Sequence, residues 1–445
     1  MDRRVKPGDD ALKKGWTGQA IVPKDASVAA ARETPAMHAV SPLAPERFPD
    51  LPEIAGVRLA SGATGTRYKG RDDLMLAELA PGSTVAGVFT RSQTASPPVE
   101  WCRKQVKRGK GRAFVVNAGN ANTFTGKDGH AAVAAEAAAA AKLVGCAPQD
   151  VFIASTGVIG VKLPVAQLVA TLPGMHKNLS AAAWKPAATA IMTTDTFAKG
   201  ATRQASIGGV KVTINGFCKG SGMIAPDMAT MLCFVFTDAK LPAPALQKLL
   251  SGAVERSFNC ITVDGDTSTS DTVLLAATGQ AKHKRIANAA DPALKDFRAK
   301  LDALILDLAH QVVRDGEGAQ KFVTINVGGA VSPKAARQIG LTVGNSPLVK
   351  TAIAAADANW GRIVAAIGRA GEKANRDKLT IGIGGVQITA KGEMVPGYDE
   401  ALVTAHMKGR DIVIDIDVGV GRGRATVWTC DLTHAYIDIN GSYRS

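Results

Sequence analysis

The sequence predicts a mixed α/β protein whose sheets contain antiparallel hairpins. Strand-like and helix-like segments alternate along 445 residues, a length that suits two domains or one large composite unit. Apolar residues make up 46% of the chain and aromatic residues only 5%, as is typical of an alanine-, valine- and glycine-rich core. No apolar run reaches the roughly 18 residues that a membrane-spanning helix needs, so a membrane partner is not expected.

The first half of the chain predicts two strands around a helix, and then a hairpin. Residues 112–117 and 151–155 are apolar strand-like runs, and the second ends at Thr156-Gly157. The alanine-rich residues 131–141 between them predict a helix that Gly145 closes. Residues 209–216 alternate in polarity and end in Asn215-Gly216, a pair typical of a hairpin turn.

The second half predicts a buried strand, two helices and a second hairpin. Residues 231–236 are continuously apolar, as in a buried strand. Residues 246–258 and 293–313 show helical periodicity. Residues 411–418 alternate strictly and are followed by a glycine-rich turn and the strand-like residues 425–428, which predicts a hairpin. The turn is not a dinucleotide-binding loop, because a strand follows it and not a helix.

The net charge of +14 raises the alternative of a nucleic-acid-binding protein. Basic residues cluster at 102–112 and 282–285, but no aromatic residues are interleaved with them for base stacking. No zinc-finger spacing or RNA-recognition signature accompanies them. We therefore predict that residues 102–112 form a solvated loop and that nucleic acid is not a specific partner. Such a basic surface could still steer an anionic substrate inward.

Cysteine and histidine spacing favours neither a disulfide scaffold nor a metal site. The six cysteines include no CxxC pair, and the seven histidines include no HExxH motif. Cys233 and Cys430 lie in strand-like segments and are predicted to be core thiols. Asp264-Gly-Asp266 resembles a metal or phosphate loop, but a structural cap through Thr267 and Ser268 is the favoured interpretation.

The segment 219–232 places Thr230 directly after the small residue Ala229, between a glycine-rich turn and the apolar run. From the pattern alone it is either an ordinary loop or a strained turn that presents a nucleophile. A threonine hydroxyl is a weak nucleophile unless a base lies beside it. An N-terminal threonine supplies its own α-amine, whose ordinary pKa is about 7.7–8.0. That solution requires cleavage of the Ala229–Thr230 bond.

This segment resembles the self-cleavage segment of the ornithine acetyltransferase family, also called the bifunctional glutamate N-acetyltransferase family. The resemblance covers nearly the whole chain after the first forty residues. Ser270 and Asp227 stand where the family often has asparagine. The segments that carry the resemblance are residues 46–50, 85–90, 117–122, 155–160, 193–196, 262–269, 314–319 and 357–362, together with the C-terminus.

The resemblance implies a layered fold of sandwich-like sheets flanked by helices, with autocatalytic cleavage into two chains. The α chain would span residues 41–229 and the β chain residues 230–445, with the active site between them and an α2β2 assembly. Residues 1–40 lie outside the resemblance and lack the apolar run of a secretory signal. We predict that they form a disordered extension of a cytoplasmic enzyme.

The resemblance also implies the roles of the site residues. Thr230 would be the nucleophile, and Thr156 and Gly157 would stabilise the oxyanion. Lys219 would pair with the substrate carboxylate, and Glu317 either with the substrate amine or with the Thr230 amine. The remaining predicted binding residues are Thr193, Asn440 and Ser445.

The implied reaction transfers the acetyl group of N-acetylornithine to glutamate through an acetyl-Thr230 enzyme, by ping-pong kinetics. Ornithine and N-acetylglutamate are the products. No cofactor is expected, and the use of acetyl-CoA as a co-substrate is left open. Two alternatives remain: a self-cleaving amidohydrolase or aminopeptidase in which water accepts the acyl group, and a basic nucleic-acid-binding protein.

Overall fold

The computed structural model describes residues 39–225 and 231–441. The predictions made for Ala229, Thr230, Ser445 and the segment 1–38 therefore lie outside the described residues.

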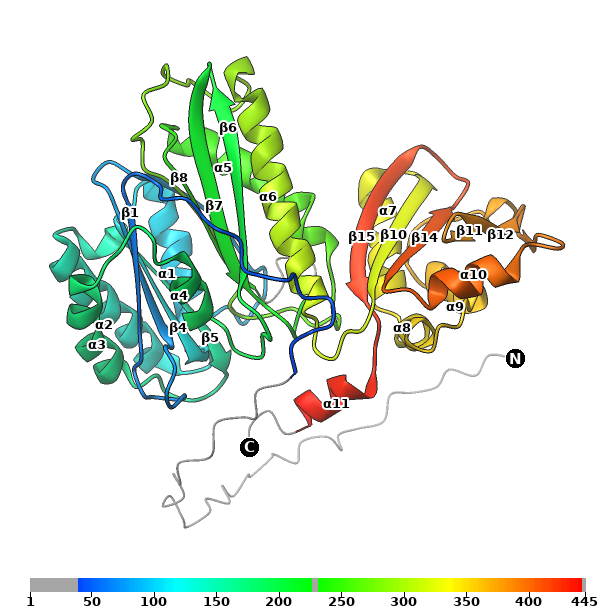
Figure 1. Cartoon of the computed structure of the whole chain (residues 1–445), viewed down its shortest axis with the longest axis horizontal. Helices are drawn as coiled ribbons and strands as arrows, with labels where there is room; N and C mark the ends of the chain where they lie inside the picture. The colour runs from blue at the N-terminus through cyan, green and yellow to red at the C-terminus, as the bar shows by residue number, and fades with distance from the viewer. Residues whose placement is uncertain (1–38, 226–230, 442–445) are drawn as a thin grey trace, which may run out of the picture. The chain divides into compact units, whose positions relative to one another are not determined.

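Two sheets pack face to face and form the sandwich that the resemblance implies (Figure 1). In the four-stranded sheet β4 and β5 are parallel and the other pairs antiparallel, in the order β1 (Val57–Gly62), β2 (Leu74–Leu79), β4 (Ala113–Asn120), β5 (Val151–Val158). In the five-stranded sheet only β8 and β9 are parallel, in the order β3 (Thr84–Phe89), β9 (Thr272–Ala277), β8 (Leu232–Thr237), β7 (Val210–Lys219), β6 (Lys199–Ile207).

The core between these sheets is an aromatic cluster. Phe114 on β4 lies 5.6 Å from Phe236 on β8, measured between ring centroids, and Trp184 lies 5.6 Å from Phe236 on another side. Helices α2 (Gly126–Val144) and α3 (Val165–Lys177) cover the outer face of the four-stranded sheet, and α5 (Ala243–Glu255) and α6 (Lys295–Arg314) cover that of the five-stranded sheet (Figure 1). Helix α1 (Pro97–Gln105), which contacts β5 and β3, and helix α4 (Trp184–Ala190) lie at the edges of the sandwich. The predicted mixed α/β class and layered sandwich are confirmed.

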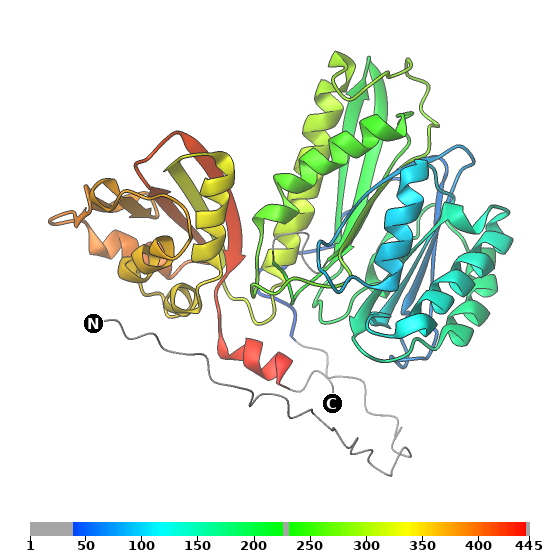
Figure 2. The same cartoon turned by 180° about the vertical axis from the view of Figure 1, so that it is seen from behind.

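A six-stranded sheet follows in the second half of the chain. Its strands run in the order β13 (Glu393–Met394), β12 (Val386–Ala390), β11 (Thr380–Ile383), β14 (Asp411–Asp417), β10 (Phe322–Ala330), β15 (Gly423–Cys430). A separate core joins it to its helices, and Figure 2 shows α7 against β10 and β15 from behind. These helices are α7 (Pro333–Gly344), α8 (Pro347–Ala354), α9 (Trp360–Gly368) and α10 (Glu400–Met407), and α11 (His434–Asn440) comes last.

Several sequence predictions are confirmed. The alanine-rich segment lies in α2, and Gly145 ends this helix in the left-handed conformation (φ +69°). The apolar run after residue 230 forms β8, which is buried along its whole length. Cys233 and Cys430 are buried free thiols. No helix in residues 39–225 and 231–441 is long and apolar enough to cross a membrane.

The predicted hairpin at Asn215-Gly216 is wrong. Strand β7 continues through this pair, and the turn lies instead at Gly208 and Gly209, between β6 and β7. The Asn215 side chain donates to the backbone oxygen of Pro52, 2.6 Å away, so it serves a contact between distant segments. Gly216 lets helix α6 approach the sheet, because a Cβ there would lie 2.9 Å from a methyl carbon of Leu308.

The second predicted hairpin is also wrong in its pairing. Both strands form where expected, as β14 and β15, but β10 lies between them and pairs with each. The glycine-rich turn crosses the end of β10: the N–H groups of Val420 and Gly421 both donate to the Gly329 oxygen, at 2.8 and 2.6 Å. The alternating pattern therefore predicts the two strands correctly, but their pairing is determined by β10, which lies much earlier in the chain.

The basic residues 102–112 do not form a solvated loop. Residues up to Gln105 belong to α1, and several arginines bind protein groups. The Nε of Arg112 donates to the Leu79 oxygen at 2.9 Å, and Arg108 lies 3.2 Å from an Asp150 carboxylate oxygen. Lys104, Lys107 and Lys110 are exposed, as is Arg108 despite its contact with Asp150.

His310 on α6 is half-buried against the six-stranded sheet, and its burial makes the stability of the protein depend on pH. Its ring lies 4.6 Å from that of Trp428, and its buried Nε2 has no hydrogen-bond partner among the described residues. Burial and the nearby Arg314 charge lower the pKa of His310 to about 4. The unfolded state, with a histidine pKa of about 6.5, therefore binds a proton more readily than the folded state between these values.

We accordingly expect His310 to reduce the free energy of unfolding by about 3 kcal/mol as the pH falls from about 6.5 to 4. Urea denaturation across this range should show that loss in the parent protein and not in His310→Phe, which keeps the ring packing. His130→Phe is the control, because His130 is exposed. An unchanged pH dependence in His310→Phe would contradict this interpretation.

Candidate active site

The predicted site residues that the structure describes line one pocket of about 150 Å³. They come from segments on both sides of the predicted cleavage bond and are separated by up to hundreds of positions in the sequence. They are Thr156, Gly157, Thr193, Lys219, Glu317 and Asn440. Ala229, Thr230 and Ser445 lie outside the described residues, so their positions stay predictions.

The carboxyl end of β5 brings Thr156 and Gly157 to the pocket. Thr156 is buried, with 4% of its surface exposed. Gly157 has a φ of +129°, which side chains with a Cβ resist. A Cβ at Gly157 would lie 2.3 Å from the carbonyl carbon of Gly119 on the neighbouring strand. Only glycine therefore fits between β4 and β5 at this point.

Lys219 connects the two sheets of the sandwich within the pocket. It is the last residue of β7, is buried, and donates from Nζ to Thr156 Oγ1 on β5 at 3.1 Å. Burial lowers the pKa of Lys219, and the nearby Asp195 carboxylate opposes this shift. The Lys219 ammonium thus lies beside Thr156, which was predicted to stabilise the oxyanion, and lines the pocket in which a substrate would bind.

Glu317 and Asn440 form another part of the pocket wall. Asn440, at the end of α11, donates from Nδ2 to Glu317 Oε2 at 2.7 Å. Burial raises the pKa of Glu317, and hydrogen bonds from Asn440 and Thr194 lower it. A Cβ at Gly222 would lie 2.3 Å from Glu317 Oε2, so the carboxylate lies directly against the glycine-rich turn.

A buried ion cluster behind the pocket was not predicted from the sequence. Lys199 Nζ donates to Asp195 Oδ1 at 2.6 Å and to Asp315 Oδ2 at 2.5 Å, and none of the three side chains is exposed. Asp195 also accepts the N–H groups of Gly220 at 2.7 Å and Thr193 at 3.0 Å. Although burial acts to raise it, the Lys199 and Lys219 charges hold the pKa of Asp195 below its ordinary value.

This cluster fixes the three segments that carry Thr193, Lys219 and Glu317. The residues 193–196 and 314–319 belong to the family resemblance, which was the available signal for Asp195 and Asp315. Nothing in the pattern identifies Lys199, because a lysine at the start of a strand ordinarily faces solvent and its partner Asp315 is 116 positions away.

Asp264 has a structural role, as predicted, but through different partners. Its carboxylate accepts the N–H groups of Met223 at 2.6 Å and Ile224 at 2.9 Å, and the Tyr436 hydroxyl at 3.3 Å. It therefore holds the turn that follows Lys219 against α11. Tyr436, which also lines the pocket, was missed by the sequence interpretation. Ser268 makes a local cap by accepting the N–H of Ser270 at 3.0 Å.

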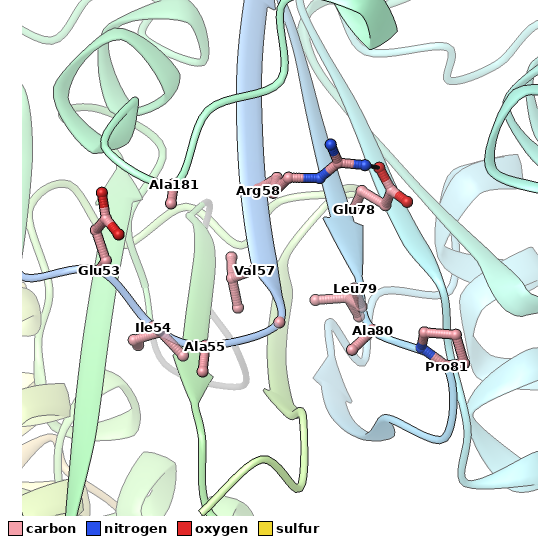
Figure 3. Close-up of a pocket in the computed structure, with 11 residues that line it drawn as sticks. Glu53, Ile54, Ala55, Val57, Arg58, Glu78, Leu79, Ala80, Pro81 and Ala181 are labelled. Carbon is pink, nitrogen blue, oxygen red and sulfur yellow. Dashed lines mark hydrogen bonds and ion pairs between the residues drawn. The ribbon is translucent and has the colours of Figure 1, made fainter.

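Within the described part of the chain, no group of three or more histidine, cysteine, aspartate or glutamate side chains could hold a metal ion. A larger pocket of about 490 Å³ lies at the edge of β1 and β2 (Figure 3). The Arg58–Glu78 ion pair, at 2.6 Å, lies on its wall. None of the predicted site residues lines this pocket, so the smaller one is the better candidate active site.

Comparison with known proteins identifies the family. The ArgJ family model matches residues 58–445. The arginine biosynthesis bifunctional protein ArgJ of Gluconobacter oxydans is 56% identical over 406 residues, which cover 91% of this chain and 96% of that protein. The protein of the same name from Rhizobium meliloti is 54% identical over 409 residues, covering 91% and 99%.

A crystal structure of the Bacillus halodurans arginine biosynthesis bifunctional protein ArgJ is 39% identical, with a TM-score of 0.45. The alignment covers 46% of this chain and 96% of that one. The family match and the two sequence relatives confirm the predicted resemblance and the predicted enzyme class. The chain therefore belongs to the ArgJ family and is an acyltransferase.

Proposed function

We propose that this enzyme transfers the acetyl group of N-acetylornithine to glutamate through an acetyl ester of Thr230. Membership of the ArgJ family supports the reaction. The observation that carries the proposal for this chain is the pocket itself, in which Thr156, Gly157, Lys219 and Glu317 lie together with Thr193 and Asn440.

The proposal begins with activation. The Thr230 hydroxyl attacks the Ala229 carbonyl carbon, the peptide C–N bond breaks, and the Ala229 acyl group moves to the hydroxyl oxygen as an ester. Water then hydrolyses the ester, which leaves an α chain of residues 41–229, with or without residues 1–40, and a β chain of residues 230–445. The new α-amine of Thr230 serves as the general base, because its ordinary pKa is near neutrality.

In the transfer, the Thr230 oxygen attacks the acetyl carbonyl carbon while the α-amine takes the hydroxyl proton. Thr156 and Gly157 donate hydrogen bonds to the oxyanion that forms. The C–N bond to ornithine breaks, the leaving amine takes the proton, and the acetyl group remains on Thr230. The α-amine of glutamate then attacks the ester, which releases N-acetylglutamate and restores the threonine hydroxyl.

The binding residues suit amino-acid substrates. Lys219 supplies a cation for a carboxylate, and Glu317 supplies a carboxylate for an amine. Thr193, Asn440 and Ser445 complete the set that we propose. No cofactor is needed. Since the relatives are named bifunctional, we also propose that acetyl-CoA can donate the acetyl group to Thr230, in which case the thiol of coenzyme A leaves in place of ornithine. We further propose that the enzyme is an α2β2 assembly and lies in the cytoplasm.

Intact-mass spectrometry tests the proposal in two steps. The purified enzyme should contain two chains that divide between Ala229 and Thr230. Mixing it with N-acetylornithine alone should add one acetyl group to the β chain, and glutamate should then remove it as N-acetylglutamate. Release of acetate at a rate that glutamate does not change would instead indicate a hydrolase. An uncleaved, unacetylated and active enzyme would overturn the proposed mechanism.

Gly222 tests the wall formed by Glu317. A Cβ at this position would overlap the Glu317 carboxylate, so Gly222→Ala must shift this carboxylate from its position. Because a hydrogen bond to a charged group contributes about 1.5–3 kcal/mol, we expect the KM for N-acetylornithine to rise by about 10–100-fold. Steady-state kinetics measure this change.

The matched control is Gly174→Ala, because no atom lies within 4 Å of a Cβ built on Gly174 in α3. Its KM should equal that of the parent enzyme. An unchanged KM in Gly222→Ala would show that the Glu317 carboxylate does not orient the substrate.

A further inference from the structure

We propose that Lys219 positions Thr156, the predicted oxyanion donor. The Lys219 ammonium donates to the oxygen of the Thr156 hydroxyl and thereby directs the hydroxyl hydrogen into the pocket. This inference rests on the proposed acetyl transfer. It gives Lys219 a second task besides pairing with the substrate carboxylate, and it explains why a lysine from one sheet contacts a threonine of the other.

The direction of the hydrogen bond follows from the two functional groups. Lys219 Nζ and Thr156 Oγ1 are 3.1 Å apart, and both residues are buried. An ammonium group has three donors and no acceptor, so Thr156 Oγ1 must accept in this contact. The single hydroxyl hydrogen then remains for another partner. Within residues 39–225 and 231–441, no protein acceptor takes it.

The pocket is where that hydrogen can find an acceptor. Thr156, Gly157 and Lys219 all line it, and the oxyanion of an acyl-transfer intermediate is an acceptor. Without the lysine, the hydroxyl can rotate and its hydrogen has no fixed direction. A hydroxyl that already accepts a hydrogen bond is also a better donor, because linked hydrogen bonds polarise one another.

Carboxylates around Lys219 hold its segment in place and oppose the lowering of its pKa by burial. Asp195 accepts the N–H of Gly220, the residue next to Lys219, at 2.7 Å and is itself bound by Lys199. Burial lowers the pKa of Lys219, whereas the Asp195, Glu317 and Asp271 carboxylates act to raise it and the Lys199 charge adds to the lowering. The geometry and these carboxylates together support an ammonium donor at Thr156.

A double-mutant cycle separates positioning from substrate binding. Lys219→Met and Thr156→Val each remove one partner while keeping side-chain bulk, and the third variant carries both changes. Loss of an oxyanion donor costs on the order of 10²–10³ in kcat, so we expect that fall in Thr156→Val and a fall of at least tenfold in Lys219→Met. In the Thr156→Val background, Lys219→Met should change kcat by less than about twofold.

The KM for N-acetylornithine serves as the second readout. It should rise whenever Lys219 is replaced, in either background, because carboxylate pairing does not depend on Thr156. If the two substitutions instead multiply in kcat, Lys219 acts independently of Thr156 and the inference is wrong. Lys211→Met is the matched control: Lys211 is an exposed lysine of the same strand, and its replacement should leave both parameters unchanged.

Chemical rescue covers variants with low activity or incomplete cleavage. Lys219→Ala leaves a space that ethylammonium can fill, and this cation should restore both transfer and self-cleavage when Thr156 is present. It should restore neither rate in Lys219→Ala/Thr156→Val. Equal rescue in both backgrounds would overturn the inference. The proposed function is tested separately by acetyl transfer in the parent enzyme. If the parent transfers acetyl groups and the variants do not behave as expected, only the inference on Lys219 fails.

Discussion

Replacing Thr230 with alanine is expected to leave the protein as one chain of 46.0 kDa and to abolish acetyl transfer. In the proposed mechanism the same hydroxyl oxygen attacks Ala229 during activation and the acetyl group during turnover. Its loss should lower kcat on the order of 10⁶-fold, as does loss of the nucleophile in a serine protease. A denaturing gel, intact-mass spectrometry and a coupled assay for ornithine measure both effects.

Two further variants make this result specific. Thr230→Ser keeps the hydroxyl and should still give two chains and a measurable transfer rate. Thr342→Ala removes a half-buried threonine of α7, outside the candidate site, and should behave as the parent does. Two chains from Thr230→Ala, divided at the same bond, would show that another group cleaves the peptide.

The local structure of this protein could be predicted from the sequence where one segment determines it. The continuous apolar run of β8 and the glycine-closed alanine helix α2 are such cases. The pairing of β14 with β10, and not with β15, depends on a strand far earlier in the chain. Asn215-Gly216 failed as a turn signal because Pro52 and Leu308, distant in sequence, use these two residues for packing.

The same limit applies to the site. Thr156, Lys219 and Glu317 could be nominated because each lies in a segment that resembles the family. Their meeting in one pocket, and the bond between Lys219 and Thr156, follow from the packing of two sheets and could not be read from spacing. Lys199 was missed because a buried cation is recognisable only once both of its carboxylate partners are known.

Lys199→Met should be among the most destabilising single substitutions in the molecule. It removes the ammonium that binds Asp195 at 2.6 Å and Asp315 at 2.5 Å, and leaves two fully buried carboxylates close to each other. Breaking a buried ion pair in this way costs about 3–5 kcal/mol in the free energy of unfolding. Urea denaturation at neutral pH measures the loss. Lys211→Met, at an exposed site, should cost little.

The pH dependence and a second substitution identify electrostatics as the cause. Without Lys199, burial and mutual repulsion hold the pKa values of Asp195 and Asp315 above those of the unfolded chain. The folded state then binds more protons, so the deficit of Lys199→Met should shrink as the pH is lowered. Lys199→Met/Asp315→Asn removes one of the two charges and should recover part of the lost stability at neutral pH. Equal stability of the single and double variants at every pH would instead point to lost packing around the lysine stem.

Asp195 also accepts the N–H groups of Thr193 and Gly220, which belong to segments that line the pocket. The double variant should therefore regain acetyl-transfer activity together with stability only if these two hydrogen bonds form again.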